Sequence, residues 1–153
     1  AEQGLNAPLN AIAKRAGVGQ GSLYRNFPTR QSLAFVAFAD NLAAIEEVVA
    51  RGGTLADVLT MVSEQAAASA AFIELIAQHP GDPHAEQLGA SLAGIIDATI
   101  EEGRASGTVP AGFTAADVIV AIQLVAGGAS VALARDREAL VRRGWELMGI
   151  RLG

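Results

Sequence analysis

The chain has 153 residues, 51% of them hydrophobic and 18% charged, so it can bury a core and is too apolar for a disordered protein. It has no cysteine, which excludes disulfides, thiolate metal sites and thiol nucleophiles. The net charge of −5 argues against a protein that coats nucleic acid without sequence preference. No signal peptide is visible, so we expect a cytoplasmic protein.

The charge is distributed unevenly along the chain. Residues 1–35 carry four basic side chains and one acidic side chain, a net charge of +3. Residues 52–153 carry six basic and twelve acidic side chains, a net charge of −6. A small basic end on an acidic body suits a protein that presents one face to phosphates.

The segment from Leu9 to Phe27 reads LNAIAKRAGVGQGSLYRNF and predicts two short helices joined by a tight turn. Ala13 has to be small because the second helix crosses close above it, and Gly17 lies where the turn favours a positive φ. Four apolar residues are expected to lock the two helices together: Ile12, Val18, Leu23 and Phe27. This is the layout of a helix-turn-helix, which places its second helix in the major groove of DNA.

The rest of the chain predicts helices almost throughout, about eight in all, and no sheet. A long helix is expected from Gln31 to about Ala50, with Thr29 as its N-cap. Capping boxes mark two more helix starts, at Thr54 with Asp57 and at Thr114 with Asp117. The remaining spans are expected from Ala85 to about Ala105, from Thr114 through Leu133, and from Glu138 to Leu152.

The stretch from Val118 to Ala134 has no charged residue but is only 17 residues long and rich in Ala and Gly, so we expect no membrane span. A helix that is apolar all round is buried on both sides. One face would meet its own domain and the other a second subunit, together with the last helix, in a two-fold four-helix interface. The alternative is a monomer with a large Ala-rich core. The residues expected at the interface are Ile122, Ala126, Gly127, Ala129, Leu140, Val141, Gly144, Trp145 and Met148.

Three runs near the N-terminus match one family pattern: AEQG at 1–4, IAKRAGV at 12–18 and GSLYRNFP at 21–28. With them, Ala1–Leu33 resembles the DNA-binding domain of the TetR family of bacterial transcriptional regulators. The resemblance implies an all-α protein, with a helix-turn-helix domain over residues 1–35 and a helical ligand-binding and dimerisation domain over residues 36–153. The chain starts where the family would be finishing its first helix, so we expect the helix-turn-helix to be poorly supported on one side.

The resemblance also implies which residues meet DNA. Tyr24 matches a tyrosine whose hydroxyl contacts phosphate, and Arg30 stands where the family commonly has a phosphate-binding lysine. Gln20 and Asn26 can each bond adenine through two hydrogen bonds, and Arg25 can read guanine; the sequence does not decide among them. Gly19 replaces the usual serine and removes the side-chain N-cap of the recognition helix. The full set expected at DNA is Asn10, Gly19, Gln20, Gly21, Ser22, Tyr24, Arg25, Asn26 and Arg30.

The leading hypothesis is therefore a transcriptional repressor that binds a double-stranded DNA operator as a homodimer and is released by a small-molecule effector. Buried polar groups need partners, so Gln65, Thr99 and Gln123 are the better candidates for effector contacts. With few aromatic residues, the sequence favours an apolar or neutral effector, and it predicts no cofactor. The candidate pocket residues, each more often plain core, are Met61, Gln65, Phe72, Ile76, Leu92, Ile96, Thr99 and Gln123.

Two other classes of function are alternatives to this hypothesis. An enzyme would draw on the carboxylates of Glu74, Asp97, Glu101 and Glu102, but no nucleophile or His–carboxylate spacing accompanies them, and a solvated acidic face explains them better. His79 and His84 lie around two prolines in an expected loop, a poor metal motif. A helical protein-interaction module with a non-functional helix-turn-helix would differ from a repressor by lacking salt-dependent DNA binding.

Overall fold

The computed structural model describes residues 9–65, 70, 74, 78 and 81–152, with the side chains of Leu9, Arg30 and Gln31 excepted. Within them it has seven helices and no strand, so the fold is all-α as the sequence predicts. The helices are α1 (Leu9–Ala16), α2 (Gln20–Asn26), α3 (Arg30–Ala50), α4 (Leu55–Glu64), α6 (Pro83–Ser106), α7 (Ala115–Val131) and α8 (Arg137–Leu147).

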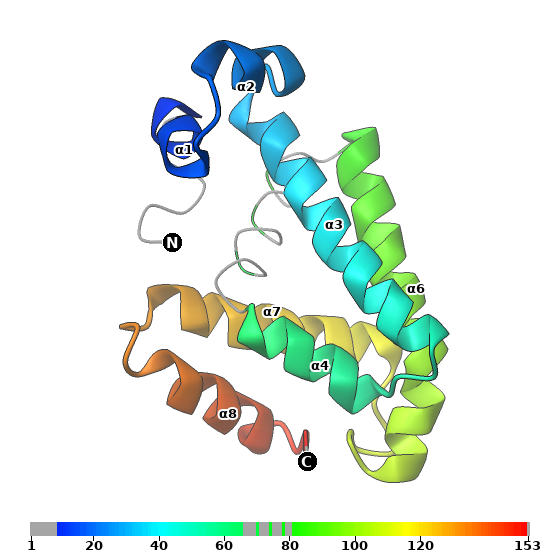
Figure 1. Ribbon diagram of the computed structural model, residues 1–153. Helices are drawn as coiled ribbons and strands as arrows, with labels where there is room; N and C mark the ends of the chain where they lie inside the picture. The colour runs from blue at the N-terminus through cyan, green and yellow to red at the C-terminus, as the bar shows by residue number, and fades with distance from the viewer. Residues whose placement is uncertain (1–8, 66–69, 71–73, 75–77, 79–80, 153) are drawn as a thin grey trace.

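The helices are arranged as a small end and a larger body (Figure 1). The short helices α1 and α2 lie together at one end, and α3 leads from them into the body alongside α6. At the other end α7 packs against both α6 and α8, and α4 lies against α6 and α3. The predicted boundary between residues 35 and 36 falls inside α3, which runs from one end to the other without a break.

Side-chain caps explain where the body helices begin. The backbone N–H of Asp57 donates to the Thr54 hydroxyl (3.2 Å), and the Thr54 N–H donates back to the Asp57 carboxylate (2.8 Å). Thr114 and Asp117 repeat this pair at the start of α7. Both predicted capping boxes are thus present, and each satisfies N–H groups that the first turn leaves without partners.

Two helices end earlier than the sequence predicted. α7 stops at Val131 rather than Leu133, and α8 stops at Leu147 rather than Leu152. Gly149 adopts φ 75°, and the N–H of Ile150 donates back to the Trp145 carbonyl, a glycine-based helix ending. The last residues then fold against the loop after α6, where the Arg151 N–H donates to the Thr108 carbonyl (2.8 Å).

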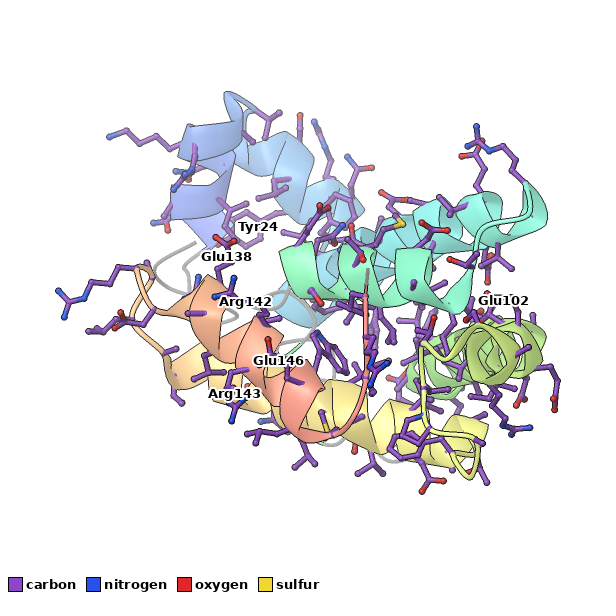
Figure 2. All side chains as sticks on the ribbon, turned by 90° about the horizontal axis from the view of Figure 1, so that it is seen from below. Tyr24, Glu102, Glu138, Arg142, Arg143 and Glu146 are labelled. Atoms are coloured by element: carbon purple, nitrogen blue, oxygen red, sulfur yellow. The ribbon has the colours of Figure 1, made fainter. Side chains whose placement is uncertain are left out.

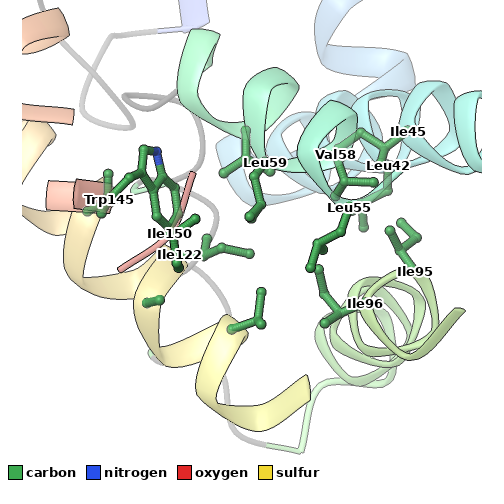
Figure 3. Close-up of a cluster of buried hydrophobic side chains, with 14 of the residues drawn as sticks. Leu42, Ile45, Leu55, Val58, Leu59, Ile95, Ile96, Ile122, Trp145 and Ile150 are labelled. Carbon is green, nitrogen blue, oxygen red and sulfur yellow. The ribbon is translucent and has the colours of Figure 1, made fainter. Parts of the chain in front are cut away.

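The main core lies where α3, α4, α6, α7 and α8 meet (Figure 3). Leu55, Leu59 and Ile96 are fully buried there. α6 approaches α4 closely at Gly103, where a β-carbon would overlap the side chain of Leu55. Within the described residues, no helix combines the length and apolar character that a membrane crossing requires.

Candidate nucleic-acid interface and body surfaces

A three-residue turn joins α1 to α2 and sets the angle between them. Gly17 has φ 67°, the left-handed conformation that the sequence predicted for this position. Ala13 is fully buried and Leu23 nearly so, with Ile12, Phe27 and Leu33 packed around them. The requirement for a small residue at position 13 is therefore confirmed.

Val18 does not join this small core, contrary to the sequence-based expectation. Its side chain is 45% exposed, because the backbone reverses at Gly17 and directs the next residue outward. It lines instead a shallow hollow of about 440 Å³ on the surface of α1 and α2, together with Asn10, Lys14 and Gln20. Lys14 was not among the residues expected at DNA, although it lies one helical turn after Asn10 on the same face.

The residues expected at DNA form an exposed surface on α2 and beside it. Tyr24 is 48% exposed, and Gly19, the N-cap of α2, provides no side-chain cap, as predicted. The side chain of Arg30 lies outside the described residues. The exposed members of the predicted set are Asn10, Gly19, Gln20, Gly21, Ser22, Tyr24, Arg25 and Asn26.

Hydrogen bonds on α2 distinguish the three candidate base-reading side chains. The Asn26 amide donates to the Ser22 carbonyl one turn earlier (2.9 Å), and the Arg25 guanidinium donates to the Ser22 hydroxyl (3.3 Å). Gln20 makes no side-chain hydrogen bond within the described part of the chain. Its amide is thus free to turn outward, whereas Asn26 already uses its donor group within its own helix.

A second surface feature is an open groove of about 1090 Å³ between α4 and α8, closed at one side by the C-terminal segment. The indole N–H of Trp145 donates to the Ser63 hydroxyl (2.8 Å) and connects the two helices. The groove is lined by Thr60, Ser63, Glu64, Ala134, Arg137, Glu138, Val141, Arg142, Trp145, Glu146, Ile150, Arg151 and Leu152.

Of the residues predicted to contact an effector, none that the structure describes lines this groove. Ile96 and Thr99 are buried in the core, and the Thr99 hydroxyl donates to the Ile95 carbonyl of its own helix. Gln123 is exposed on α7. Met61 and Leu92 pack against the main core, Gln65 caps the end of α4, and Phe72 and Ile76 lie outside the described residues.

The free apolar face of α7 and α8 differs from the one the sequence predicted. Gly127 and Leu140 are exposed as expected, and Gly144 and Met148 are half-buried. Five predicted interface residues are packed into the chain's own core and cannot meet a partner there: Ile122, Ala126, Ala129, Val141 and Trp145. The exposed apolar side chains on these helices are Val120, Leu124, Val131, Leu140 and Leu147.

Comparison with known proteins agrees with this geometry. A sequence profile of bacterial regulatory proteins of the TetR family matches residues 1–37, which include α1, the turn and α2. The crystal structure of a TetR transcriptional regulator from Streptomyces coelicolor is similar with a TM-score of 0.59 and 28% sequence identity, over 96% of this chain and 87% of that chain. Both matches are to TetR-family regulators, so the N-terminal helix-turn-helix segment is of the TetR type and the fold as a whole resembles that of the family. No match is found among curated proteins.

This TetR-family protein is thus a DNA-binding transcriptional regulator with the helix-turn-helix at its N-terminal end. Three of the four carboxylates that could serve an enzyme have structural partners. Glu101 pairs with Arg104 (2.7 Å), and Glu102 accepts the N–H of Leu55 (3.0 Å), which ties α6 to the start of α4 (Figure 2). Glu74 accepts from the Gln78 amide, and Asp97 is exposed on α6.

The histidines of the TetR-family protein give no metal centre within the described residues, where no cluster of three potential ligands occurs. His84 lies near Asp82 (3.3 Å), the N-cap of α6, and its ring stacks on Phe35 of α3 with 5.7 Å between centroids. His79 lies outside the described residues. His84 therefore acts as a contact between α3 and α6.

Proposed function

We propose that this TetR-family protein is a homodimeric repressor that leaves its operator when a small-molecule effector binds the helical body. The observation that carries the proposal is the exposed polar surface of α2, held on α1 by a compact apolar contact. In addition, α3 runs continuously from this unit into the body, so a shift of the body helices can move the recognition helix. Such a protein works beside the chromosome, in the cytoplasm.

In this proposal one group of side chains contacts the phosphates of DNA and another contacts the bases. Tyr24, Lys14 and Arg30 contact phosphates, which fix the register of the protein on the duplex. Gln20 and Arg25 reach base edges in the major groove, and Gln20 prefers adenine. The net charge of +3 over residues 1–35 attracts this end of an otherwise acidic protein to the duplex.

The exposed apolar stripe supports the homodimer. Val120, Leu124, Gly127 and Val131 recur every three or four residues, so they lie along one face of α7. Val131 is 85% exposed and Leu124 64% exposed, and Leu147 of α8 is 70% exposed. Pairing α7 and α8 with their copies about a two-fold axis buries this stripe in a four-helix contact and gives two recognition helices.

DNA binding is tested by selecting bound sequences from a random library with the full chain, and then measuring affinity against salt. We expect a two-fold symmetric site with half-sites about one helical turn apart, and an affinity that falls steeply as salt rises. Gln20→Ala relaxes base preference within each half-site, whereas the matched control Gln87→Ala, exposed on α6, leaves it unchanged. If no selected or genomic fragment binds at low salt, the proposal is wrong.

The dimer is tested by light scattering on the wild type and on the double variant Leu124→Glu/Val131→Glu. We expect a dimer that becomes a folded monomer, because two charges would be buried without partners in the contact. Val36→Glu changes an exposed valine on α3 and serves as the control. A wild type that stays monomeric at high concentration contradicts the homodimer.

A further inference from the structure

The groove between α4 and α8 combines a buried apolar floor with a charged rim. Val141, Trp145 and Ile150 form the floor and are each less than one-tenth exposed. Its volume of about 1090 Å³ lies slightly above the roughly 300–1,000 Å³ typical of small-molecule sites. The groove can therefore hold a molecule with a sizeable apolar body.

The side chain of Arg137, which lines the groove, is oriented by a hydrogen bond. Its Nε donates to the Ala129 carbonyl at the end of α7 (3.0 Å), which fixes the plane of the guanidinium. The side chain is half-buried, and within the described part of the chain it takes part in no ion pair. The remaining N–H groups of its fork are thus positioned in the groove without an anionic partner.

Within the described residues, none of the carboxylates that line the groove forms an ion pair with this guanidinium. Glu146 already pairs with Arg143 (3.0 Å). The side chain of Arg143 projects from α8 on the opposite side of the helix from Arg142 (Figure 2). Glu138 precedes Arg142 by one helical turn and forms no ion pair within the described residues. Glu64 is exposed to solvent on the opposite wall.

A half-buried charge without a counter-charge is costly, and the fork of an arginine matches a carboxylate in geometry. We propose that this groove binds an amphipathic organic anion, whose acidic group is held by Arg137 and whose apolar body covers Val141 and Trp145. The identification of this anion as the effector rests on the proposed function, whereas its binding in the groove does not. It replaces the apolar or neutral effector that the sequence favoured.

A hydrogen bond in the groove can transmit the effect of a bound ligand from α8 to α4. The hydrogen bond from Trp145 to Ser63 joins α8, which carries part of the proposed dimer face, to α4 of the body. A ligand on Trp145 presses against this connection and changes the distance between the two helices. Because Trp145 is the single tryptophan of the chain, its fluorescence reports directly on the groove.

The test is a titration of the full chain, followed by Trp145 fluorescence, with three probes that share a ten-carbon tail: decanoate, decanol and decyltrimethylammonium, each below its micelle-forming concentration. We expect decanoate to bind at least about tenfold more tightly than the other two, the effect of one charge-assisted contact. Arg137→Gln abolishes this preference and leaves decanol binding unchanged, and Arg137→Lys retains part of it. The control Arg135→Gln, an exposed arginine just before α8 that does not line the groove and whose partner Asp136 does not line it either, retains it fully.

The proposal is overturned if decanol or the cation binds as tightly as decanoate, or if Arg135→Gln weakens decanoate as much as Arg137→Gln does. If Arg137→Gln fails to fold, as judged by circular dichroism, the ranking of the three probes on the wild type still decides. The titration contains no DNA, so a failure to bind any operator contradicts the proposed function and not the ligand class. Decanoate that binds and releases operator DNA supports both.

Discussion

The helix-turn-helix and the helical body bury very different amounts of apolar surface. From residue 9 onward, the part of the first unit that the structure describes, Ala13 and Leu23 are its buried core, with Ile12, Phe27 and Leu33 partly covered around them. The body draws its core from five helices. A surface that has to face DNA keeps its polar residues outside, so its stability rests on few contacts. Segments that bind ligands commonly belong to the less stable parts of a protein.

The largest expected effect comes from the core of the body. Leu59→Ala removes a fully buried side chain, and we expect the free energy of unfolding to fall by about 2–5 kcal/mol. Leu133→Ala, at a position 60% exposed, changes it by less than about 0.5 kcal/mol. Urea unfolding followed by Trp145 fluorescence measures both. Equal effects would contradict the placement of Leu59 in the core.

The second prediction separates the two units. Ala13→Leu overfills the contact between α1 and α2 at a cost of about 1–3 kcal/mol, so amide exchange in these helices accelerates and DNA affinity falls. The unfolding of the body reported by Trp145 changes little, because α1 and α2 are not part of its core. Ala11→Leu places the same side chain on the exposed face of α1 as a control. If Ala13→Leu shifts the Trp145 transition as much as Leu59→Ala does, the two cores are one cooperative unit.

The capping boxes give a smaller effect. Thr54→Ala and Thr114→Ala each remove the oxygen that accepts an N–H of the first helical turn, and each lowers the free energy of unfolding by about 1 kcal/mol. Thr60→Ala is the control, since the Thr60 hydroxyl bonds the Ala56 carbonyl within α4 and caps no helix. A Thr60→Ala effect as large as that of Thr54→Ala would contradict the assigned role of the caps.

The same boxes predict a pH dependence on the acid side. The backbone N–H and then the hydroxyl of Thr54 lower the pKa of Asp57, and the hydroxyl and then the N–H of Thr114 lower the pKa of Asp117, from an ordinary value of 3.8. The stabilisation is therefore complete above this value and is lost as the pH falls through the lowered folded pKa. Both carboxyls face solvent, which keeps the effect small.

Urea midpoints measured from about pH 5 down to about pH 3 check this dependence. We expect the double variant Asp57→Asn/Asp117→Asn to lose stability less steeply with acid than the wild type does. Asp97→Asn, exposed on α6, keeps the wild-type slope. A double variant with the wild-type slope would show that these two carboxyls are not the source.

The smallest effect is expected at the start of the recognition helix. Gly19 has φ −65° and ψ 134°, a conformation that serine adopts readily, so Gly19→Ser adds a cap and stabilises α2 by roughly a few tenths of a kcal/mol. Gly17→Ser has the opposite sign, since φ 67° strains any residue with a β-carbon. Amide exchange of α2 distinguishes the two, and equal signs would contradict the assigned turn geometry.

Much of the architecture could be predicted from the sequence because the signals are local. The capping boxes at Thr54 and Thr114 mark helix starts within four residues. Gly17 and Ala13 mark the turn and the crossing of the helix-turn-helix. The end of α8 was placed too late, because Gly149 stops the helix through a hydrogen bond that the apolar pattern does not encode.

The sequence by itself determined the all-α fold, the resemblance to the TetR family and which short segment forms the helix-turn-helix, because caps, turns and the recognition motif act between near neighbours in the chain. Only the tertiary structure decided which face of α7 is free, since a helix apolar all round has no sided pattern to read. It also decided where the groove lies. Ser63 and Trp145, which meet in it, are 82 residues apart, and only packing brings them together.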